Sequence, residues 1–134
     1  MDNKYYLDTS IWLDYYEKRG RNGELALALI NKLIDKKELI IYSDMILMEL
    51  KKLKYSEFEI NEIFRVVKPI LIRVHISREQ KEETKRMKNY IDIPLKDIMH
   101  GILARDNEAI IVYTDKHFEK LKYLVEMKKP EELA

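Results

Sequence analysis

Four short apolar runs, separated by segments with helical periodicity, constrain the fold of this chain most strongly. The runs cover residues 4–8, 39–42, 70–76 and 109–113, and each has the length and apolar density of a buried strand. Short strands that alternate with helices build parallel sheets with helices on their faces. The sequence therefore predicts an α/β fold, in which a parallel sheet of about four to five strands is flanked by helices.

The segments between these runs carry the signals that start and stop helices. Ser43 is placed to cap the helix after the second run. Ser56 with Glu59, and Ser77 with Gln80, have the spacing of capping boxes. We expect helices over residues 11–18, 24–37, 45–53, 56–67, 77–90, 95–105 and 116–124.

The 134 residues suit a single compact domain. No internal repeat, linker or low-complexity segment divides the sequence. We expect the domain to cover residues 1–127, and residues 128–134, which are charged and contain Pro130, to form a tail that frays. Residues 19–23, which include two glycines, are expected to form a loop between the first two helices.

Charge and composition exclude several classes of protein. The 25 basic and 24 acidic residues nearly cancel, so any contact with RNA or DNA would depend on local basic patches. The absence of cysteine excludes disulfides and thiolate metal sites, and suits a reducing compartment. No apolar run approaches the roughly 20 residues that span a bilayer, and no signal-peptide core is visible. We therefore expect a soluble cytoplasmic protein that does not bind a membrane.

Acidic residues follow the first and last predicted strands. Asp8 ends the first strand and Asp115 closely follows the last. The carboxyl ends of parallel strands meet at one edge of a sheet, so these two acids should lie at the same edge. Glu49 borders the buried face of the helix after the second strand, and Asp97 lies in the first turn of the helix that follows Pro94.

Four partly buried carboxylates would repel one another strongly unless a cation joined them. The chain has no cysteine and no paired histidine motif. A hard divalent cation with oxygen ligands, Mg²⁺ or Mn²⁺, is then the natural counter-ion.

Each of these acids also has an ordinary structural interpretation. Asp8 and Asp115 could cap the helices that follow them, and Asp97 could complement a helix dipole. Glu49 could be a half-exposed helix residue. We favour a site because all four are expected at one edge of the sheet. The residues with surface or packing roles still open are His75, His100, His117 and Trp12, and those assigned to the surface are Asp14, Asp44, Asp92 and Asp106.

Three longer stretches surround the acids: "YYLDTSIWL", "YSDMILMEL" and "PLKDIMHGILARDNEAIIVYTDKHFEKL". Together they resemble, in order and spacing over almost the whole chain, the PIN-domain ribonucleases, and most closely the VapC toxins of prokaryotic toxin–antitoxin pairs. The resemblance implies that an acidic quartet catalyses the reaction and holds Mg²⁺ or Mn²⁺; the matching residues are Asp8, Glu49, Asp97 and Asp115.

Residues beside the quartet match the family less completely. Ser10 matches a hydroxyl that supports the first acid. Many relatives have Thr or Ser two residues before the last acid, where this chain has Tyr113, with Thr114 one step closer. Many also have a further acid at the position of His117.

The resemblance implies a metal-dependent endoribonuclease that hydrolyses RNA phosphodiester bonds, acting as the toxin of a toxin–antitoxin system with an antitoxin protein as partner. Lys51, Lys52 and His117 are candidates for binding the substrate. Two alternatives remain: a housekeeping RNA-processing PIN nuclease, and a catalytically silent PIN-like module that binds protein or RNA.

A homodimer is also expected, because the helix pair over residues 45–67 carries more apolar side chains than one sheet edge should bury. The residues that create this surplus are Leu50, Leu53, Tyr55, Phe58, Ile63 and Phe64.

Overall fold

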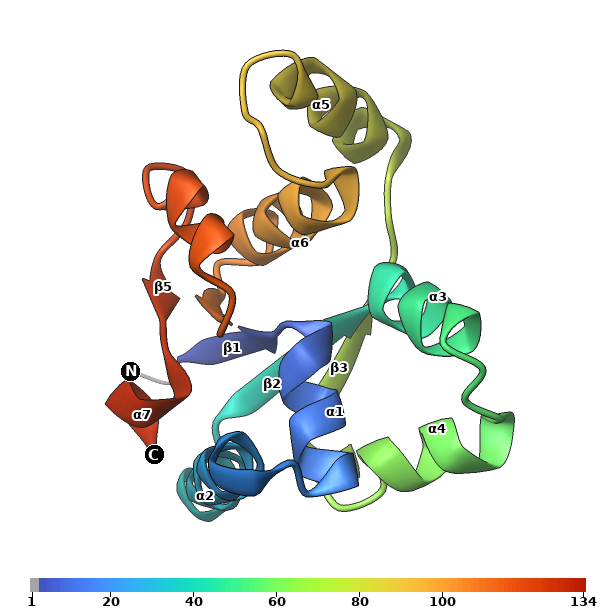
Figure 1. Ribbon diagram of the computed structural model, residues 1–134, viewed down its shortest axis with the longest axis vertical. Helices are drawn as coiled ribbons and strands as arrows, with labels where there is room; N and C mark the ends of the chain where they lie inside the picture. The colour runs from blue at the N-terminus through green and yellow to red at the C-terminus, as the bar shows by residue number, and fades with distance from the viewer. Residues whose placement is uncertain (1–2) are drawn as a thin grey trace.

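Five parallel strands form one sheet, in the order β3-β2-β1-β4-β5, in the computed structural model, which describes residues 3–134 (Figure 1). Tyr6 of the central strand pairs with Ile41 of β2 and with Ile111 of β4. The strands are β1 (Lys4–Leu7), β2 (Leu39–Ser43), β3 (Leu71–Val74), β4 (Ile110–Val112) and β5 (Met127–Lys128). The expected α/β fold is confirmed.

Helices cover both sides of this sheet. Figure 1 shows α1 and α2 on one side of β1 and α6 on the other, with α5 packed outside α6. The helices are α1 (Thr9–Glu17), α2 (Gly20–Lys36), α3 (Asp44–Lys52), α4 (Glu57–Phe64), α5 (Arg78–Lys88), α6 (Leu95–Asp106) and α7 (Pro130–Leu133), with short 3-10 helices η1 (Lys68–Ile70) and η2 (Lys116–Leu121). Residues 116–124, expected as an α-helix, thus begin as a 3-10 helix.

The order of the strands fixes where a site can form. After β1 the chain adds β2 and β3 on one side, and it then returns to place β4 and β5 on the other. Open parallel sheets bind ligands at such a switch point, outside the carboxyl ends of the strands. Here the switch point lies between β1 and β4, directly beside Asp8.

Local capping signals start the helices where the sequence predicts. Both expected capping boxes form, at Ser56 with Glu59 and at Ser77 with Gln80. Ser43 accepts a hydrogen bond from the backbone N–H of Ile46 and caps α3. These residues satisfy backbone donors that a helix leaves free at its first turn.

The expectation of a loop over residues 19–23 is wrong, because α2 already begins at Gly20. Gly20 has a φ of +54°, and Lys18, in the same left-handed region, ends α1. Gly23 serves packing: a Cβ there would lie 2.8 Å from the carbonyl carbon of Lys18 and 2.9 Å from the backbone oxygen of Asp14. The glycines therefore allow α2 to approach the end of α1 closely.

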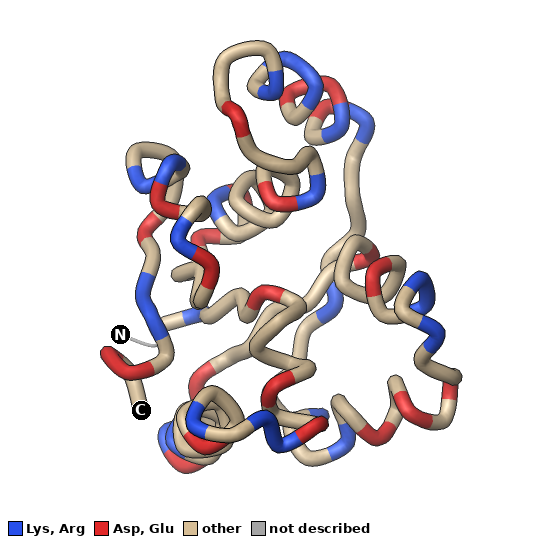
Figure 2. The backbone as a smooth tube through the Cα atoms, in the orientation of Figure 1, with Lys and Arg blue, Asp and Glu red and all other residues tan. Residues whose placement is uncertain are grey.

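This close approach also explains why the surface assignment of Asp14 is wrong. Asp14 is buried, and Nη1 of Arg19 lies 3.8 Å from its carboxylate. Asp44 is half-buried, and Asp92 and Asp106 are exposed. Elsewhere charges of both signs are interspersed along the chain, as Figure 2 shows for α5.

The expected fraying of residues 128–134 is also contradicted. Lys128 pairs with Val112 in the sheet, and its carbonyl accepts a hydrogen bond of 3.2 Å from the backbone N–H of Tyr113. Pro130 is buried, and α7 packs against α2. The boundary expected after residue 127 falls inside β5. No helix within residues 3–134 is long and apolar enough to cross a membrane.

Candidate functional site

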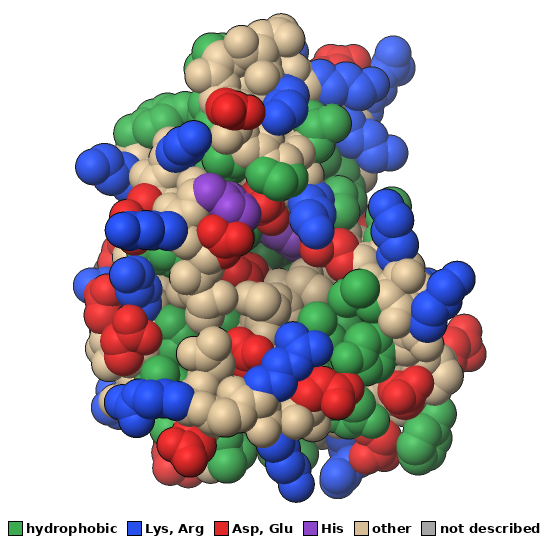
Figure 3. All heavy atoms as spheres, viewed as in Figure 1, with side chains coloured by type: hydrophobic (Ala, Val, Ile, Leu, Met, Phe, Trp, Pro, Cys, Tyr) green, Lys and Arg blue, Asp and Glu red, His purple; other side chains and the backbone are tan. Residues whose placement is uncertain are grey.

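A cavity of about 260 Å³ opens at the switch point between β1 and β4. Side chains of all four predicted acids line it, although they come from four separate elements of the fold. In Figure 3, histidine and acidic side chains gather around a hollow near the middle of the face shown. The lining residues are Asp8, Thr9, Ser10, Glu49, Pro94, Lys96, Asp97, His100, Asp115, His117 and Phe118.

Asp8 is the most buried of the four acids. It directly follows β1 and caps α1, and its Oδ1 accepts hydrogen bonds from Ser10 Oγ (2.6 Å) and from the backbone N–H of Ile11 (3.2 Å). Burial raises the pKa of Asp8 to about 6, although the bond from Ser10 and the nearby His100 oppose this rise. Ser10 Oγ also lies 3.0 Å from Thr114 Oγ1. Ser10 therefore touches Asp8 directly, whereas Thr114 reaches it through Ser10.

His117 joins two of the other acids. Its Nε2 lies 2.6 Å from Oδ2 of Asp97, in the first turn of α6, and its Nδ1 lies 2.7 Å from Oδ1 of Asp115. Asp115 caps η2 by accepting a bond from the backbone N–H of His117. An imidazolium has two N–H donors and satisfies both carboxylates at once. The ring of His117 therefore lies between Asp97 and Asp115, two acids that the sequence predicts to bind the same ion.

Glu49 is held by three donors. Its Oε1 accepts hydrogen bonds from Thr9 Oγ1 (3.0 Å) and from His100 Nε2, and Lys96 Nζ lies 3.6 Å from its Oε2. Burial acts to raise the pKa of Glu49, but the hydrogen bonds from His100 and Thr9 and the nearby Lys96 outweigh it and lower the pKa. Glu49 is therefore set up to remain a carboxylate.

The donor set suits a hard divalent cation, because carboxylate oxygens are the ligands that Mg²⁺ and Mn²⁺ prefer. The hydrogen bonds above use one oxygen each of Asp8, Asp97 and Asp115, so the second oxygen of each remains to coordinate an ion. As the side chains lie, however, no three acidic or histidine residues within 3–134 are close enough together to surround one ion. Asp97 and Asp115, which both contact His117, would therefore have to rearrange before they could bind the same metal.

The two lysines expected to bind substrate lie in different grooves. Lys52 lines a groove of about 560 Å³ that it shares with Met48, Glu49 and Lys96, so this groove adjoins the acidic cavity. Lys51 lines a separate groove of about 530 Å³ with Lys68 and Arg73. Only Lys52 is therefore positioned beside the site.

Sequence reasoning missed Thr9 and Lys96 as contacts of Glu49. Lys96 directly precedes Asp97 in the sequence, and this adjacency was the only available signal. His75, in contrast, lies outside the cavity, with its Nδ1 3.0 Å from Oδ2 of Asp44.

Comparison with known proteins identifies the fold. The model of the PIN domain family matches residues 5–123. A comparison with curated proteins finds no match. Among solved structures, VapBC2 from Rickettsia felis, bound to a DNA fragment from its promoter, has a TM-score of 0.67 at 17% identity, over 94% of this chain and 98% of that chain.

Two further structures are similar over nearly the whole chain. VapC20 from Mycobacterium tuberculosis, described as a toxin that cleaves the sarcin-ricin loop, has a TM-score of 0.66 at 14% identity, over 86% of this chain and 92% of that chain. DNA-bound VapBC from Salmonella typhimurium has a TM-score of 0.68 at 15% identity, over 96% and 98% of the two chains. At these identities the likeness concerns the fold.

Proposed function

We propose that this chain, which belongs to the PIN domain family, is a metal-dependent endoribonuclease and the toxin of a toxin–antitoxin pair. The observation that carries the proposal is the convergence of Asp8, Glu49, Asp97 and Asp115 on one cavity at the switch point of the sheet. A module that only bound protein or RNA would gain nothing from carboxylates gathered in this way.

Asp8, Asp97 and Asp115 would hold the divalent ion, with Glu49 as a direct or water-mediated ligand. When bound, Mg²⁺ or Mn²⁺ supplies Lewis-acid chemistry, lowering the pKa of a water molecule and neutralising charge on the phosphate. Ser10 holds Asp8 in place through a bond of 2.6 Å. Lys52 and Lys96, on the adjoining groove, can attract the phosphates on either side of the bond to be cleaved.

RNA is the proposed substrate because one structural relative, VapC20, is described as cleaving the sarcin-ricin loop. The near-neutral charge of the chain agrees with local contacts at Lys52 and Lys96 rather than a broad basic surface. We place this activity in the cytoplasm.

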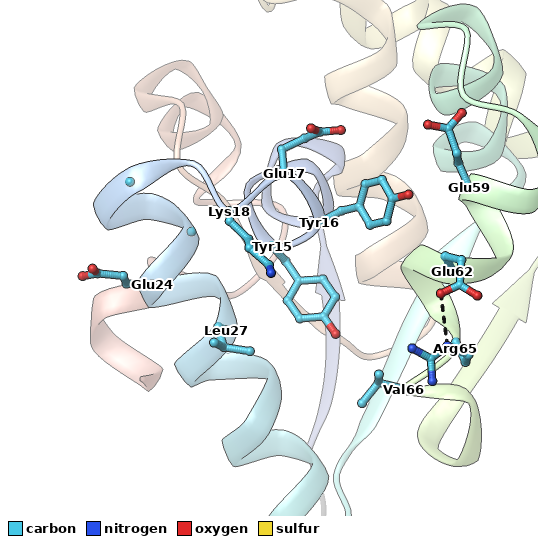
Figure 4. A pocket seen from close by; sticks show the side chains of 12 residues that line it. Tyr15, Tyr16, Glu17, Lys18, Glu24, Leu27, Glu59, Glu62, Arg65 and Val66 are labelled. Carbon is cyan, nitrogen blue, oxygen red and sulfur yellow. Dashed lines mark hydrogen bonds and ion pairs between the residues drawn. The ribbon is translucent and has the colours of Figure 1, made fainter.

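An antitoxin partner is proposed because several structural relatives are VapBC complexes. We propose a groove of about 920 Å³ between α1–α2 and α4 as the binding site for this antitoxin. Figure 4 shows Tyr15 and Tyr16 on one wall, facing Glu62, Arg65 and Val66 on the other.

The lining of this groove indicates the chemistry of the segment it would take. Four acids and two bases lie among its apolar side chains, so an amphipathic segment with Lys or Arg along its edge would complement it. A Lys or Arg from another part of the same antitoxin that reached the acidic cavity would compete there with the metal. The residues of the groove are Tyr15, Tyr16, Glu17, Lys18, Gly20, Gly23, Glu24, Leu27, Glu59, Glu62, Arg65 and Val66.

The proposed homodimer rests on a smaller apolar surface than the sequence predicts. Leu50, Ile63 and Phe64 are buried within the chain itself and leave no surplus there. Phe58 and Leu53 remain 72% and 55% exposed, and Met48 adds a further exposed apolar side chain. Light scattering should give about twice the chain mass of 16.2 kDa; a monomer mass at micromolar concentration would refute the dimer.

Cleavage assays on a structured RNA with exposed loops test the enzymatic part. We expect cleavage with Mg²⁺ or Mn²⁺, none in EDTA, and losses of orders of magnitude in Asp8→Asn and Asp97→Asn. Asp92→Asn, at an exposed acid outside the cavity, is the matched control and should retain activity. Undiminished cleavage in EDTA would contradict the proposal.

Expression in cells separates the toxin from an RNA-processing enzyme. The toxin should arrest growth when expressed alone, and the protein encoded next to it should relieve the arrest and copurify with it. Normal growth, with no copurifying inhibitor, would favour the processing nuclease.

A further inference from the structure

A buried chain of side-chain hydrogen bonds leads from the sheet to the acidic cavity. Ser43 Oγ, at the end of β2, lies 2.6 Å from the hydroxyl of Tyr6, and that hydroxyl lies 2.6 Å from His100 Nδ1. On its other side, His100 Nε2 contacts Oε1 of Glu49. Ser43, Tyr6 and His100 are all buried. This series of hydrogen bonds therefore links the interior of the protein to the carboxylate of Glu49.

When the His100 ring is neutral, one arrangement of protons allows Ser43, Tyr6, His100 and Glu49 to form all of these hydrogen bonds. Ser43 Oγ accepts from the backbone N–H of Ile46, so its own proton can go to the oxygen of Tyr6. The Tyr6 hydroxyl then donates to His100 Nδ1, which accepts. His100 carries its proton on Nε2 and donates it to Glu49. Burial raises the pKa of Tyr6, so its hydroxyl keeps the proton that this arrangement needs.

The position of Glu49 explains why such support matters. Glu49 comes from α3, whereas Asp8 directly follows β1 and Asp97 belongs to α6. A glutamate side chain has three rotatable bonds, and repulsion from Asp8 and Asp97 would turn it away from the cavity. The donor on His100 opposes this, because His100 lies one turn after Asp97 and α6 brings both residues to the cavity.

We propose that Tyr6 and His100 are positioning residues that hold Glu49 toward the cavity, with Tyr6 selecting the Nε2-protonated form of His100. This inference rests on the proposed metal-dependent function. His100 is not a catalytic residue, because both of its ring nitrogens are engaged and its side chain is buried. Its effect on the reaction passes through Glu49, as partners of metal ligands act elsewhere.

The sharpest variant is Tyr6→Phe, which removes one hydroxyl and leaves the ring in the core. Calorimetric titration with Mn²⁺ should show affinity about tenfold weaker than that of the wild type, the usual effect of losing a partner behind a metal ligand. Tyr5→Phe is the matched control. Tyr5 is buried on the same strand, but its hydroxyl contacts Asn3 and takes no part in the hydrogen bonds that lead to Glu49. The control should bind Mn²⁺ as the wild type does.

Two substitutions of His100 test the donor itself. His100→Leu removes the donor and should weaken Mn²⁺ binding at least as much as Tyr6→Phe. His100→Gln offers an amide N–H to Glu49 and should recover most of the affinity. A loss of packing alone would affect both substitutions alike, so recovery in the glutamine variant supports a positioning role.

Nitrogen NMR of the metal-free protein at pH 8 gives a readout independent of the ion. The His100 ring should be protonated on Nε2 in the wild type and should lose this preference in Tyr6→Phe. A ring protonated on Nδ1, or Mn²⁺ affinity unchanged in folded Tyr6→Phe and His100→Leu, would overturn the inference alone. Wild-type protein that binds no Mn²⁺, or Asp8→Asn that binds it unchanged, would overturn the proposed function together with it.

Discussion

Nε2 of His117 lies 2.6 Å from Oδ2 of Asp97, so a histidine is the direct partner of one of the acids proposed to hold the metal. The same ring contacts Asp115 through Nδ1 at 2.7 Å. The ring therefore engages one oxygen of each of these two acids, and a metal ion that bound the same oxygens would compete with it.

Replacing His117 with Asn should strengthen metal binding. The shorter amide cannot span Asp97 and Asp115, so an ion no longer has to displace a bound ring from both. Mn²⁺ titration should show a severalfold gain in affinity. His75→Asn is the control, because His75 also contacts an acid, Asp44, but outside the cavity. Equal or weaker binding in His117→Asn would show that the histidine supports the metal and does not compete with it.

Asp8 should make the metal-free protein less stable as the pH rises. Its pKa is raised by burial from 3.8 to about 6, so the folded state holds this proton more tightly than the unfolded state. The stabilising contribution is then complete below pH ~4 and is lost as the pH rises through about 6. Asn keeps the helix cap without the charge, so Asp8→Asn should gain stability relative to the wild type over this range.

Urea unfolding at pH 4 and pH 7 in EDTA measures this difference. The gain of Asp8→Asn between the two pH values should reach about 1–3 kcal/mol, and saturating Mn²⁺ should reverse it at pH 7 because the ion favours the carboxylate. Parallel pH profiles of the two proteins would show that burial does not disfavour ionised Asp8.

The acids that sequence reasoning found are those whose places follow from chain-level rules. Asp8 and Asp115 each follow a strand, so the parallel sheet alone brings both to one edge. Asp97 lies at a helix start, and the capping boxes at Ser56 and Ser77 depend only on residues three apart. Each of these signals is contained in one short stretch of sequence.

The features that were missed depend on contacts between distant elements. The bond from Tyr6 to His100 spans 94 residues, and the one from Thr9 to Glu49 spans 40. No local pattern encodes such pairs. Gly23 shows a different difficulty: glycine signals both a loop and a close helix contact, and only the backbone of Asp14 and Lys18 distinguishes them.

Gly23→Ala should destabilise the protein by about 1–3 kcal/mol, because the new Cβ would press on backbone atoms that cannot move independently. Gly20→Ala is the comparison, because a Cβ there meets no atom within 4 Å and only the φ of +54° opposes the change. This backbone conformation should cost alanine about 1 kcal/mol. Thermal unfolding should rank Gly23→Ala as the less stable variant. The reverse order would mean that α2 can shift away from α1 at little cost.

Lys52 and Lys96 should contribute to RNA binding more than Lys51 does. Both line the groove that adjoins Glu49, whereas Lys51 lines a separate one. In an Asp8→Asn background that prevents cleavage, Lys52→Ala and Lys96→Ala should each weaken binding of a single-stranded RNA. Each substitution should also lower the slope of the logarithm of the RNA-binding constant against the logarithm of the salt concentration by about one, the amount expected for one lost phosphate contact. Lys51→Ala is the control. An equal loss of RNA binding in that variant would show that the RNA also lies along the groove that Lys51 lines.

The groove between α1–α2 and α4 should take the antitoxin without taking part in cleavage. Leu27 and Val66 line it and are both well exposed, so Leu27→Glu and Val66→Glu can alter the groove without disturbing the core. The apolar side of a bound segment would cover these two positions, so each new carboxylate would be buried without a partner and should weaken binding. Both variants should therefore cleave RNA normally but escape inhibition by the antitoxin, measured by pull-down and by growth arrest during co-expression. Ile72→Glu, at an exposed position outside the groove, should stay inhibited; escape of that control as well would place the antitoxin elsewhere on the surface.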